Sequence, residues 1–543
     1  MIPFDLNGKF QPNGEVATLR RRAVRGAGIT VFSQGVVFVA QMASTIILAR
    51  LLTPTDFGLV AMVTTFSLLL ANFGLNGFSE AIIQREEINH FLASNLFWIS
   101  VGGALVLSIA FAAAGSELAR FYGDQRVAHI AVAMSLAIFM SSGSVVHLAL
   151  LKRDMRFSAT SANGVVAGAV AVAVTIALAW AGWGYWSLVA GAIVQPTILA
   201  IGAWYLCRWV PSLPRRVPGT GSVIRFALNV YGRFSFNYFT RNTDNLLVGW
   251  QFGSSSLGFY KKAYDLFLLP ANQLITPVAD VVLSALSKVE RGSAEYKRYF
   301  LNGLSILSLV GMAAGAVLTL SGRDLIRVLL GAKWGAAGQV FVFFGPGIGI
   351  MMIYSASGLI HLSIGRADRW FRWVVVEFGV TVVLFILGLH WGPVGVASAW
   401  TTSFWILAIP AFWYAGRPIH FGVAPVLAVV WKFALASLLA AGASIVIIHR
   451  ISSLMVASGI FGALARIATI SVLFLVLYVA AVILLHGGTG PIRSLVGLLP
   501  DMLPGARSSE SRRPEAAARN SERRWKDIAT VSEGARRTVE RNK

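Results

Sequence analysis

Long stretches without a single Asp, Glu, Lys or Arg are the feature that most constrains this fold. Within the first 151 residues, four such stretches occupy positions 26–49, 58–79, 94–116 and 127–151. The hydrocarbon core of a bilayer is about 30 Å thick, and a helix of about 20 apolar residues crosses it. Only 13% of the 543 residues are charged, whereas a soluble protein has about 25%. The sequence therefore predicts an all-α polytopic membrane protein.

The remaining spans follow the same pattern. An uncharged run from 159 to 207 is long enough for two spans, with a hinge at Gly182, Trp183 and Gly184. After a basic linker that contains prolines, we expect spans at 222–249, 257–286, 301–322, 335–365, 373–390, 395–415, 426–448 and 466–485. The expected total is about fourteen transmembrane helices. The two spans that follow the linker differ from the others because ionisable residues lie inside them.

The distribution of Lys and Arg predicts the orientation. With the N-terminus placed in the cytoplasm and loops assigned alternately, the inside segments before residue 487 contain 20 Lys and Arg, and the outside segments contain 8. Cytoplasmic loops of membrane proteins carry such an excess of positive charge. We therefore expect both termini in the cytoplasm.

The C-terminal tail is basic but has little else in common with nucleic-acid-binding segments. Residues 487–543 contain 12 Lys and Arg against 7 acidic residues, with Trp525 as the single aromatic residue. A disordered segment beside anionic lipid headgroups accounts for this composition. We expect membrane lipids as partners and no nucleic acid.

Several kinds of chemistry are excluded by composition. The single cysteine, Cys207, excludes an intrachain disulfide framework and a cysteine-rich metal site. The histidines have no paired metal-ligand spacing, and neither an HExxH motif nor a Ser-His-Asp arrangement is present. We expect no catalytic residue, no metal, no cofactor and no enzyme activity.

Polar side chains instead gather inside three of the expected helices. They recur mostly at intervals of three or four, so each set is predicted to lie on one helix face. The second span has Asn72, Asn76 and Glu80; the seventh has Asn229, Arg233, Asn237, Arg241 and Asp244; the eighth has Lys261, Asp265, Asn272, Gln273, Thr276 and Asp280. Ionisable groups at membrane depth usually face a partner or a water-filled cavity. These stripes therefore predict a polar cavity lined by asparagines and charged groups.

Two interpretations of the charged groups stay open. In the first, helical ion pairs hold the bundle together, namely Arg241 with Asp244 and Lys261 with Asp265. This leaves Arg233 and Lys262 without a partner in their own helices. In the second, the surplus cations bind an anionic cargo, because Arg offers a bidentate fork to phosphate oxygens.

Carboxylates within the spans suggest a further role. Glu80, Asp244, Asp265, Asp280 and Glu377 are candidates for carrying H⁺ or Na⁺ in an antiport cycle. The sequence does not indicate which of them would do so.

A weak internal repeat relates the two halves of the chain. Residues 51–58 end the first span and open the second, and residues 251–258 do the same between the seventh and eighth, at an offset of 200. Each segment is a short turn rich in hydroxyl groups that ends in a glycine, and a hydroxyl there can cap the next helix. Repeated bundles around a midplane site are a common architecture of secondary transporters.

Six segments carry a resemblance to a known family. They are residues 50–62 (RLLTPTDFGLVAM), 81–85 (AIIQR), 151–157 (LKRDMRF), 240–249 (TRNTDNLLVG), 257–264 (LGFYKKAY) and 330–334 (LGAKW). In these motifs the chain resembles the polysaccharide transport family (Wzx-type flippases) of the multidrug/oligosaccharidyl-lipid/polysaccharide exporter superfamily. The resemblance covers roughly residues 30–415.

The resemblance implies two six-helix lobes in a V, two further C-terminal helices and alternating access. The corresponding domains are a cytoplasmic segment 1–28, an N-lobe 29–207, a linker 208–221, a C-lobe 222–415, two additional helices 416–486 and the basic tail 487–543. It also implies translocation of undecaprenyl-pyrophosphate-linked oligosaccharide repeat units across the bacterial inner membrane for exopolysaccharide, O-antigen or capsule synthesis. A polysaccharide polymerase and glycosyltransferases are the implied partners.

The site residues implied by the resemblance are few. Arg233, Arg241, Lys261 and Lys262 would bind the pyrophosphate or acidic sugars, with Asp244 as their partner or as a coupling residue.

Two alternatives remain. A multidrug or other small-molecule exporter of the same superfamily would line its cavity with carboxylates and aromatic rings. A membrane polysaccharide polymerase or ligase would need a large outer loop, whereas the longest here, near 323–334, is short.

Overall fold

The structure is a computed structural model that describes residues 3–5, 8–10, 35, 38–73, 77–85, 87–217, 220–450 and 459–493. The chain divides into two units, Met1–Gly488 and Thr489–Lys543, and the first is described below. The regular secondary structure of the described residues is helical, apart from two isolated bridges near the N-terminus. Ten helical stretches among them are long and apolar enough to cross a membrane. This establishes an all-helical membrane protein, while the expected number of fourteen spans stays a prediction.

The first half of this unit contains nine helical segments among its described residues. A short apolar helix, Phe38–Leu51, precedes α2 (Pro54–Ala71), α3 (Phe78–Gln84), α4 (His90–Ala113), α5 (Gly115–Tyr122), α6 (Arg126–Ser142), α7 (Val145–Arg153), α8 (Phe157–Trp180) and α9 (Tyr185–Cys207). Thr53 caps α2 as the sequence predicts, because its hydroxyl accepts a hydrogen bond from the backbone N–H of Asp56. The hinge predicted at Gly182 to Gly184 is confirmed, since it separates α8 from α9.

The polar stripe predicted on the second span is wrong. α2 ends at Ala71, and α3 begins only at Phe78. At the end of α2 the side chain and the backbone N–H of Asn72 both donate hydrogen bonds to the carbonyl of Leu68, at 2.7 and 3.2 Å. Asn72 and Glu80 therefore belong to different elements, and Asn76 lies outside the described residues.

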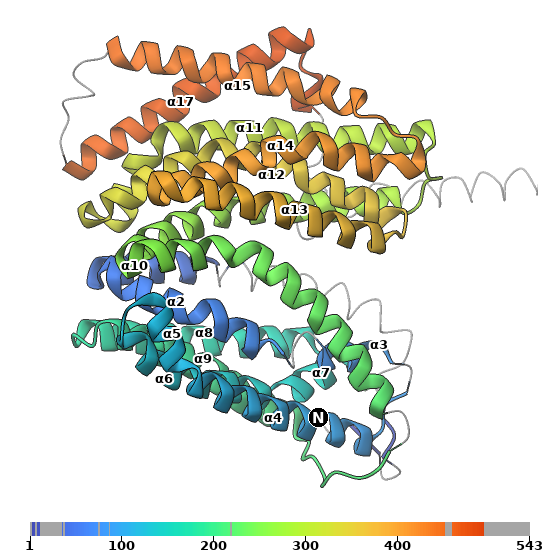
Figure 1. Cartoon of the computed structure of the whole chain (residues 1–543). Helices are drawn as coiled ribbons and strands as arrows, with labels where there is room; N and C mark the ends of the chain where they lie inside the picture. The colour runs from blue at the N-terminus through green and yellow to red at the C-terminus, as the bar shows by residue number, and fades with distance from the viewer. Residues whose placement is uncertain are drawn as a thin grey trace, which may run out of the picture. The chain divides into compact units, whose positions relative to one another are not determined.

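The second half consists of long helices, drawn from green to red in Figure 1. In the described part of the chain they are α10 (Thr220–Leu286), α11 (Ala294–Leu330), α12 (Gly335–Ser363), α13 (Ala367–Gly388), α14 (Gly392–Gly416), α15 (Ala424–Arg450) and α17 (Gly459–His486). α10 packs against α2 of the first half and against α12 of the second, whereas α15 and α17 pack on α11. α10 combines two of the predicted spans, and the turn expected between them is reduced to a break at Gly253, where φ is +76°.

The two repeat segments contact each other directly. A Cβ atom on Gly58 would lie 1.7 Å from the carbonyl oxygen of Ser254, and one on Gly258 would lie 1.9 Å from that of Pro54. Pro54 and Ser254 are themselves 200 positions apart, as are the two glycines, so the contact is reciprocal. The backbones of α2 and α10 can approach this closely only because both positions lack a side chain.

Residues just before α2 make further contacts between the two halves at the same end of the molecule. The indole N–H of Trp334 donates to the carbonyl of Ala49 at 2.8 Å, and Lys333 Nζ donates to the carbonyl of Arg50 at 2.9 Å. In return, the Arg50 guanidinium donates to the carbonyl of Val328 at 2.9 Å. Trp334 is fully buried, with the ring of Phe57 5.5 Å from its own. We call these contacts, together with the glycine contacts of α2 and α10, the junction.

Substituting one junction glycine is expected to destabilise the protein. Gly258→Ala would drive a methyl group into the Pro54 carbonyl, and such overpacking typically costs about 1–3 kcal/mol. Gly102→Ala is the matched control, because a methyl group added to this helical glycine would meet no atom within 4 Å. Thermal unfolding of the detergent-purified variants should show a lower midpoint for Gly258→Ala alone. Equal midpoints would contradict the contact.

Candidate functional site

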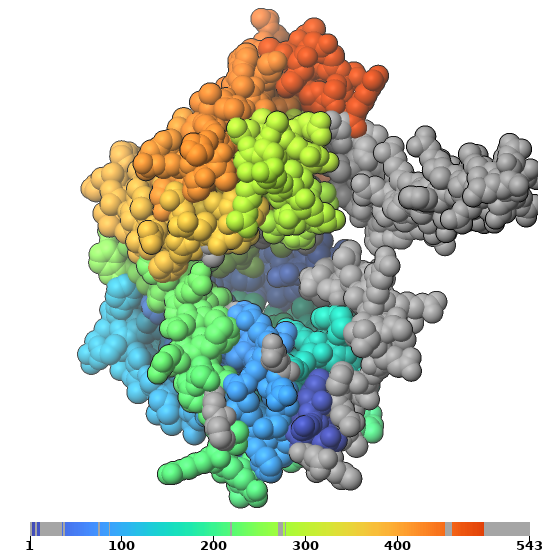
Figure 2. Space-filling model, turned by 90° about the vertical axis from the view of Figure 1, so that its right-hand side faces the viewer, coloured from blue at the N-terminus to red at the C-terminus, as the bar shows by residue number. Residues whose placement is uncertain are grey.

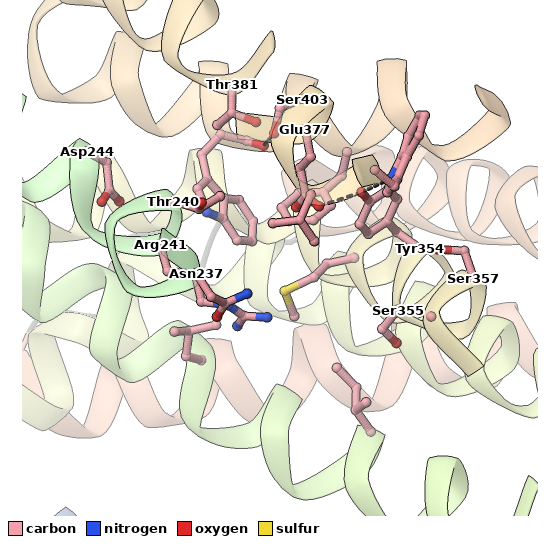
Figure 3. Close-up of a pocket in the computed structure, with 18 of the residues that line it drawn as sticks. Asn237, Thr240, Arg241, Asp244, Tyr354, Ser355, Ser357, Glu377, Thr381 and Ser403 are labelled. Carbon is pink, nitrogen blue, oxygen red and sulfur yellow. Dashed lines mark hydrogen bonds between the residues drawn. The ribbon is translucent and has the colours of Figure 1, made fainter. Parts of the chain in front are cut away.

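A polar cavity of about 240 Å³ lies among four helices of the second half. Its wall contains hydroxyl, amide and charged groups that surround the open space in Figure 3. They come from α10 (Asn237, Thr240, Arg241, Asp244), α12 (Tyr354, Ser355, Ser357), α13 (Glu377, Thr381) and α14 (Ser403). The aromatic side chains of Tyr264, Trp370, Trp373 and Trp400 also contribute to the lining.

The helical repeat of α10 brings its polar residues to this cavity. Asn237 and Arg241 are one step of four residues apart, and each such step turns the side chain by about 40° around the helix. Asn229 and Arg233 continue the same face, and all four side chains are exposed. Arg225, also exposed, extends the spacing by one further step. Sequence reasoning missed Arg225, although the interval of four before Asn229 was visible.

The ion pair expected between Arg241 and Asp244 does not form. Asp244 is 1% exposed and accepts hydrogen bonds of 2.8 Å from the hydroxyl of Tyr260 and from the backbone N–H of Asn245. Figure 3 shows the Asp244 carboxylate directed away from the Arg241 guanidinium. The hydroxyl partner keeps the carboxylate solvated, so it does not need the arginine. Across the described part of the chain, neither Arg233 nor Arg241 takes part in an ion pair.

The second carboxylate of the cavity is held by a chain of hydrogen bonds. The indole N–H of Trp373 donates to the Tyr354 hydroxyl at 2.7 Å, and that hydroxyl donates to Glu377 Oε2 at 2.8 Å. Both aromatic residues are 8% exposed. Sequence reasoning named Glu377 but missed Tyr354 and Trp373, because uncharged aromatic residues in an apolar span give no local signal.

The two lysines expected at the site have other partners. Lys261 forms an ion pair with Asp265 one turn along α10, which confirms that pair of the first interpretation. Lys262 Nζ lies 4.2 Å from the centre of the Phe57 ring, an interaction between the two halves at the junction. Of the four predicted cations, the cavity wall contains Arg241.

The remaining predicted residues also lie away from this cavity. Asn72 caps the end of α2, Glu80 is half-buried in the first turn of α3, and Asp280 is exposed near the end of α10. The side chain of Asn272 lies outside the described residues.

Removing the Tyr354 hydroxyl tests the chain of hydrogen bonds. Tyr354→Phe keeps the ring but leaves the Trp373 N–H and the Glu377 carboxylate without this partner, which typically costs about 1–3 kcal/mol. Tyr205→Phe is the control, because Tyr205 is 72% exposed. We expect a lower unfolding midpoint for Tyr354→Phe, and a midpoint equal to that of the control would refute the role of the hydroxyl.

Curated relatives match most of this chain. The succinoglycan biosynthesis transport protein ExoT of Rhizobium meliloti (strain 1021) is 22% identical over 380 residues, which cover 70% of this chain and 77% of the relative. The lipopolysaccharide biosynthesis protein WzxC of Escherichia coli (strain K12) is 20% identical over 413 residues, covering 74% and 82%.

Solved structures show the same fold. The lipid II flippase MurJ in an inward closed conformation matches with a TM-score of 0.66 at 14% identity, covering 82% of this chain and 97% of its own. An inward-facing multidrug resistance MATE family transporter of the MOP superfamily matches with a TM-score of 0.58 at 14% identity, covering 71% and 94%. The family profile described as "Polysaccharide biosynthesis protein" matches residues 47–338, more than half of the chain. The chain belongs to this polysaccharide biosynthesis protein family.

Proposed function

We propose that the protein is a flippase that moves undecaprenyl-pyrophosphate-linked oligosaccharide repeat units across the bacterial inner membrane by alternating access. Family membership and a MurJ-like fold support a transport function in polysaccharide synthesis. Two relatives carry names from succinoglycan transport and lipopolysaccharide synthesis. The protein would act for exopolysaccharide, O-antigen or capsule assembly, beside a polymerase and glycosyltransferases.

The unpaired Arg241 guanidinium in the cavity is the observation that carries this proposal. Asp244 is buried and Glu377 is half-buried, and each is bonded to a tyrosine, whereas the Arg241 side chain in the same wall is exposed. Arg233 lies on the same face of α10 and is exposed. Two guanidinium groups on one face suit a pyrophosphate, whose oxygens accept bidentate hydrogen bonds.

The arrangement of the two halves supports alternating access. They are joined at the junction, where Gly58 meets Ser254 and Trp334 bonds to Ala49. Figure 2 views the molecule from the side on which α3 lies in Figure 1, and here the surface is hollowed between the blue-to-green helices and the yellow-to-orange helices. In our proposal the junction is the closed periplasmic end and the hollow opens to the cytoplasm.

The finer topology and the energy source are part of the same proposal. We keep the arrangement of fourteen helices in two six-helix lobes with two additional helices, the domain bounds given above and both termini in the cytoplasm. H⁺ or Na⁺ coupling would use Glu377 or Asp244, because these carboxylates line the cavity. Glu80, Asp265 and Asp280 are weaker candidates, since they do not.

The two alternatives are less well supported. An exporter of organic cations would line its cavity with accessible carboxylates, whereas here Asp244 is buried, Glu377 is half-buried and the exposed Arg241 lies in the same wall. A polymerase or ligase would need a large outer loop, whereas segment 323–334 is helical and bonds to residues 49–52.

Removing the cavity cations should impair transport. We expect Arg241→Gln and Arg233→Gln each to lower the flipping rate of a labelled lipid-linked repeat unit in proteoliposomes by roughly 10- to 100-fold, because a charge-assisted hydrogen bond contributes about 1.5–3 kcal/mol. Arg120→Gln is the control, since this arginine is exposed and pairs with Glu117 on the surface.

Two outcomes would contradict the cargo assignment. One is a normal flipping rate in both cavity variants at equal expression. The other is export of an organic cation by the wild type with no movement of the glycolipid, which would favour the small-molecule exporter.

A further inference from the structure

Three turns at one end of the second half surround a second pocket, of about 460 Å³. They connect α10 to α11, α12 to α13 and α14 to α15, and they meet because successive helices run in opposite directions. Gly292 lies against the third turn, where a Cβ atom would be 3.2 Å from the carbonyl oxygen of Ile419. Gly365 is in the second turn, and a Cβ atom placed on it would be 3.9 Å from the guanidinium of Arg291 in the first turn. Side chains from all three turns therefore face one space, which we call the turn pocket.

The turn pocket is basic. Its lining has three cationic side chains, Arg291, Lys297 and Arg366, together with His420, and no carboxylate. Among the described residues, Arg291, Lys297 and His420 form no ion pair. Cationic side chains around one cavity repel one another unless an anion lies between them.

The acidic groups nearby neutralise only part of this charge. Asp368 accepts a hydrogen bond of 3.1 Å from Arg366 Nε and also lies 4.0 Å from Arg372. Glu295 pairs with Arg298 at 3.8 Å, outside the pocket. Neither of these carboxylates, nor that of Glu290 beside Arg291, lines the turn pocket.

The start of α11 adds a further positive element. The helix begins at Ala294 after the cap Ser293, so Lys297 lies in its first turn. Backbone N–H groups at a helix N-terminus favour an anion, and phosphate groups are commonly bound there. The side chain of Lys297 is half-buried at this position, and no described group accepts a hydrogen bond from it.

We propose that the turn pocket binds a phosphate group, carried either by the headgroup of an anionic lipid or by a soluble phosphate compound. Arg291 and Arg366 would offer planar forks to its oxygens, and Lys297 a point charge at the helix end. The turn pocket shares no residue with the polar cavity that contains Arg241. It is thus a site additional to the proposed transport path, and it does not depend on the identity of the cargo.

Native mass spectrometry of the delipidated full chain tests this site. The protein is titrated separately with phosphatidylglycerol, phosphatidylcholine and inorganic pyrophosphate. We expect phosphatidylglycerol or pyrophosphate to bind in preference to phosphatidylcholine. The double variant Arg291→Gln/Arg366→Gln should weaken that binding by roughly tenfold or more. Arg298→Gln is the matched control, an exposed neighbour outside the pocket.

Each outcome has a defined meaning. Selective binding of phosphatidylglycerol that the double variant loses supports a lipid headgroup, whereas the same pattern with pyrophosphate supports a soluble ligand. Equal binding of all three probes, unchanged binding in the double variant, or an equal loss in Arg298→Gln overturns the proposal. If the double variant fails to fold, Lys297→Gln gives the same comparison, with the same results expected.

Discussion

The contact between the backbones of α2 and α10 is the constraint on which the rest of this structure depends. Gly58 and Gly258 allow each helix to reach a carbonyl of the other, so no side chain separates the two backbones at this contact. This close approach fixes the position of α10, and the same helix also contributes to the cavity wall. Arg241 and Asn237 therefore reach their places in the cavity wall through a contact made elsewhere along α10.

The two carboxylates of the cavity have uncharged hydrogen-bond partners instead of an arginine. Asp244 and Glu377 are bound by the hydroxyls of Tyr260 and Tyr354, which solvate a carboxylate without cancelling its charge. An arginine salt bridge would have consumed the cation as well. Arg241 therefore has no ion-pair partner among the described residues, although two carboxylates line the same cavity.

Sequence patterns correctly predicted those features of the structure that depend on the local spacing of residues. The apolar runs identified the membrane class, the glycines at 182 and 184 identified the hinge, and the Lys261–Asp265 pair follows from a spacing of four. The prediction failed where the partner lies beyond a break in the helix or on another helix, and where the helix itself stops. Asp244 bonds to Tyr260 across the break at Gly253, and Trp373 reaches Tyr354 on another helix. α2 ends at Ala71, before the polar intervals continue, and a count of intervals does not detect this end.

The donors that Trp334 and Lys333 supply to the last carbonyls of helix Phe38–Leu51 have a consequence for opening. Separation of the halves would strip these carbonyls of their protein donors within a crevice, and each must then be hydrated. Because water substitutes for such a donor at a net cost of only about 0.5–1.5 kcal/mol, the closed and open forms can stay close in free energy. Opening at the junction would therefore require water to reach these carbonyls.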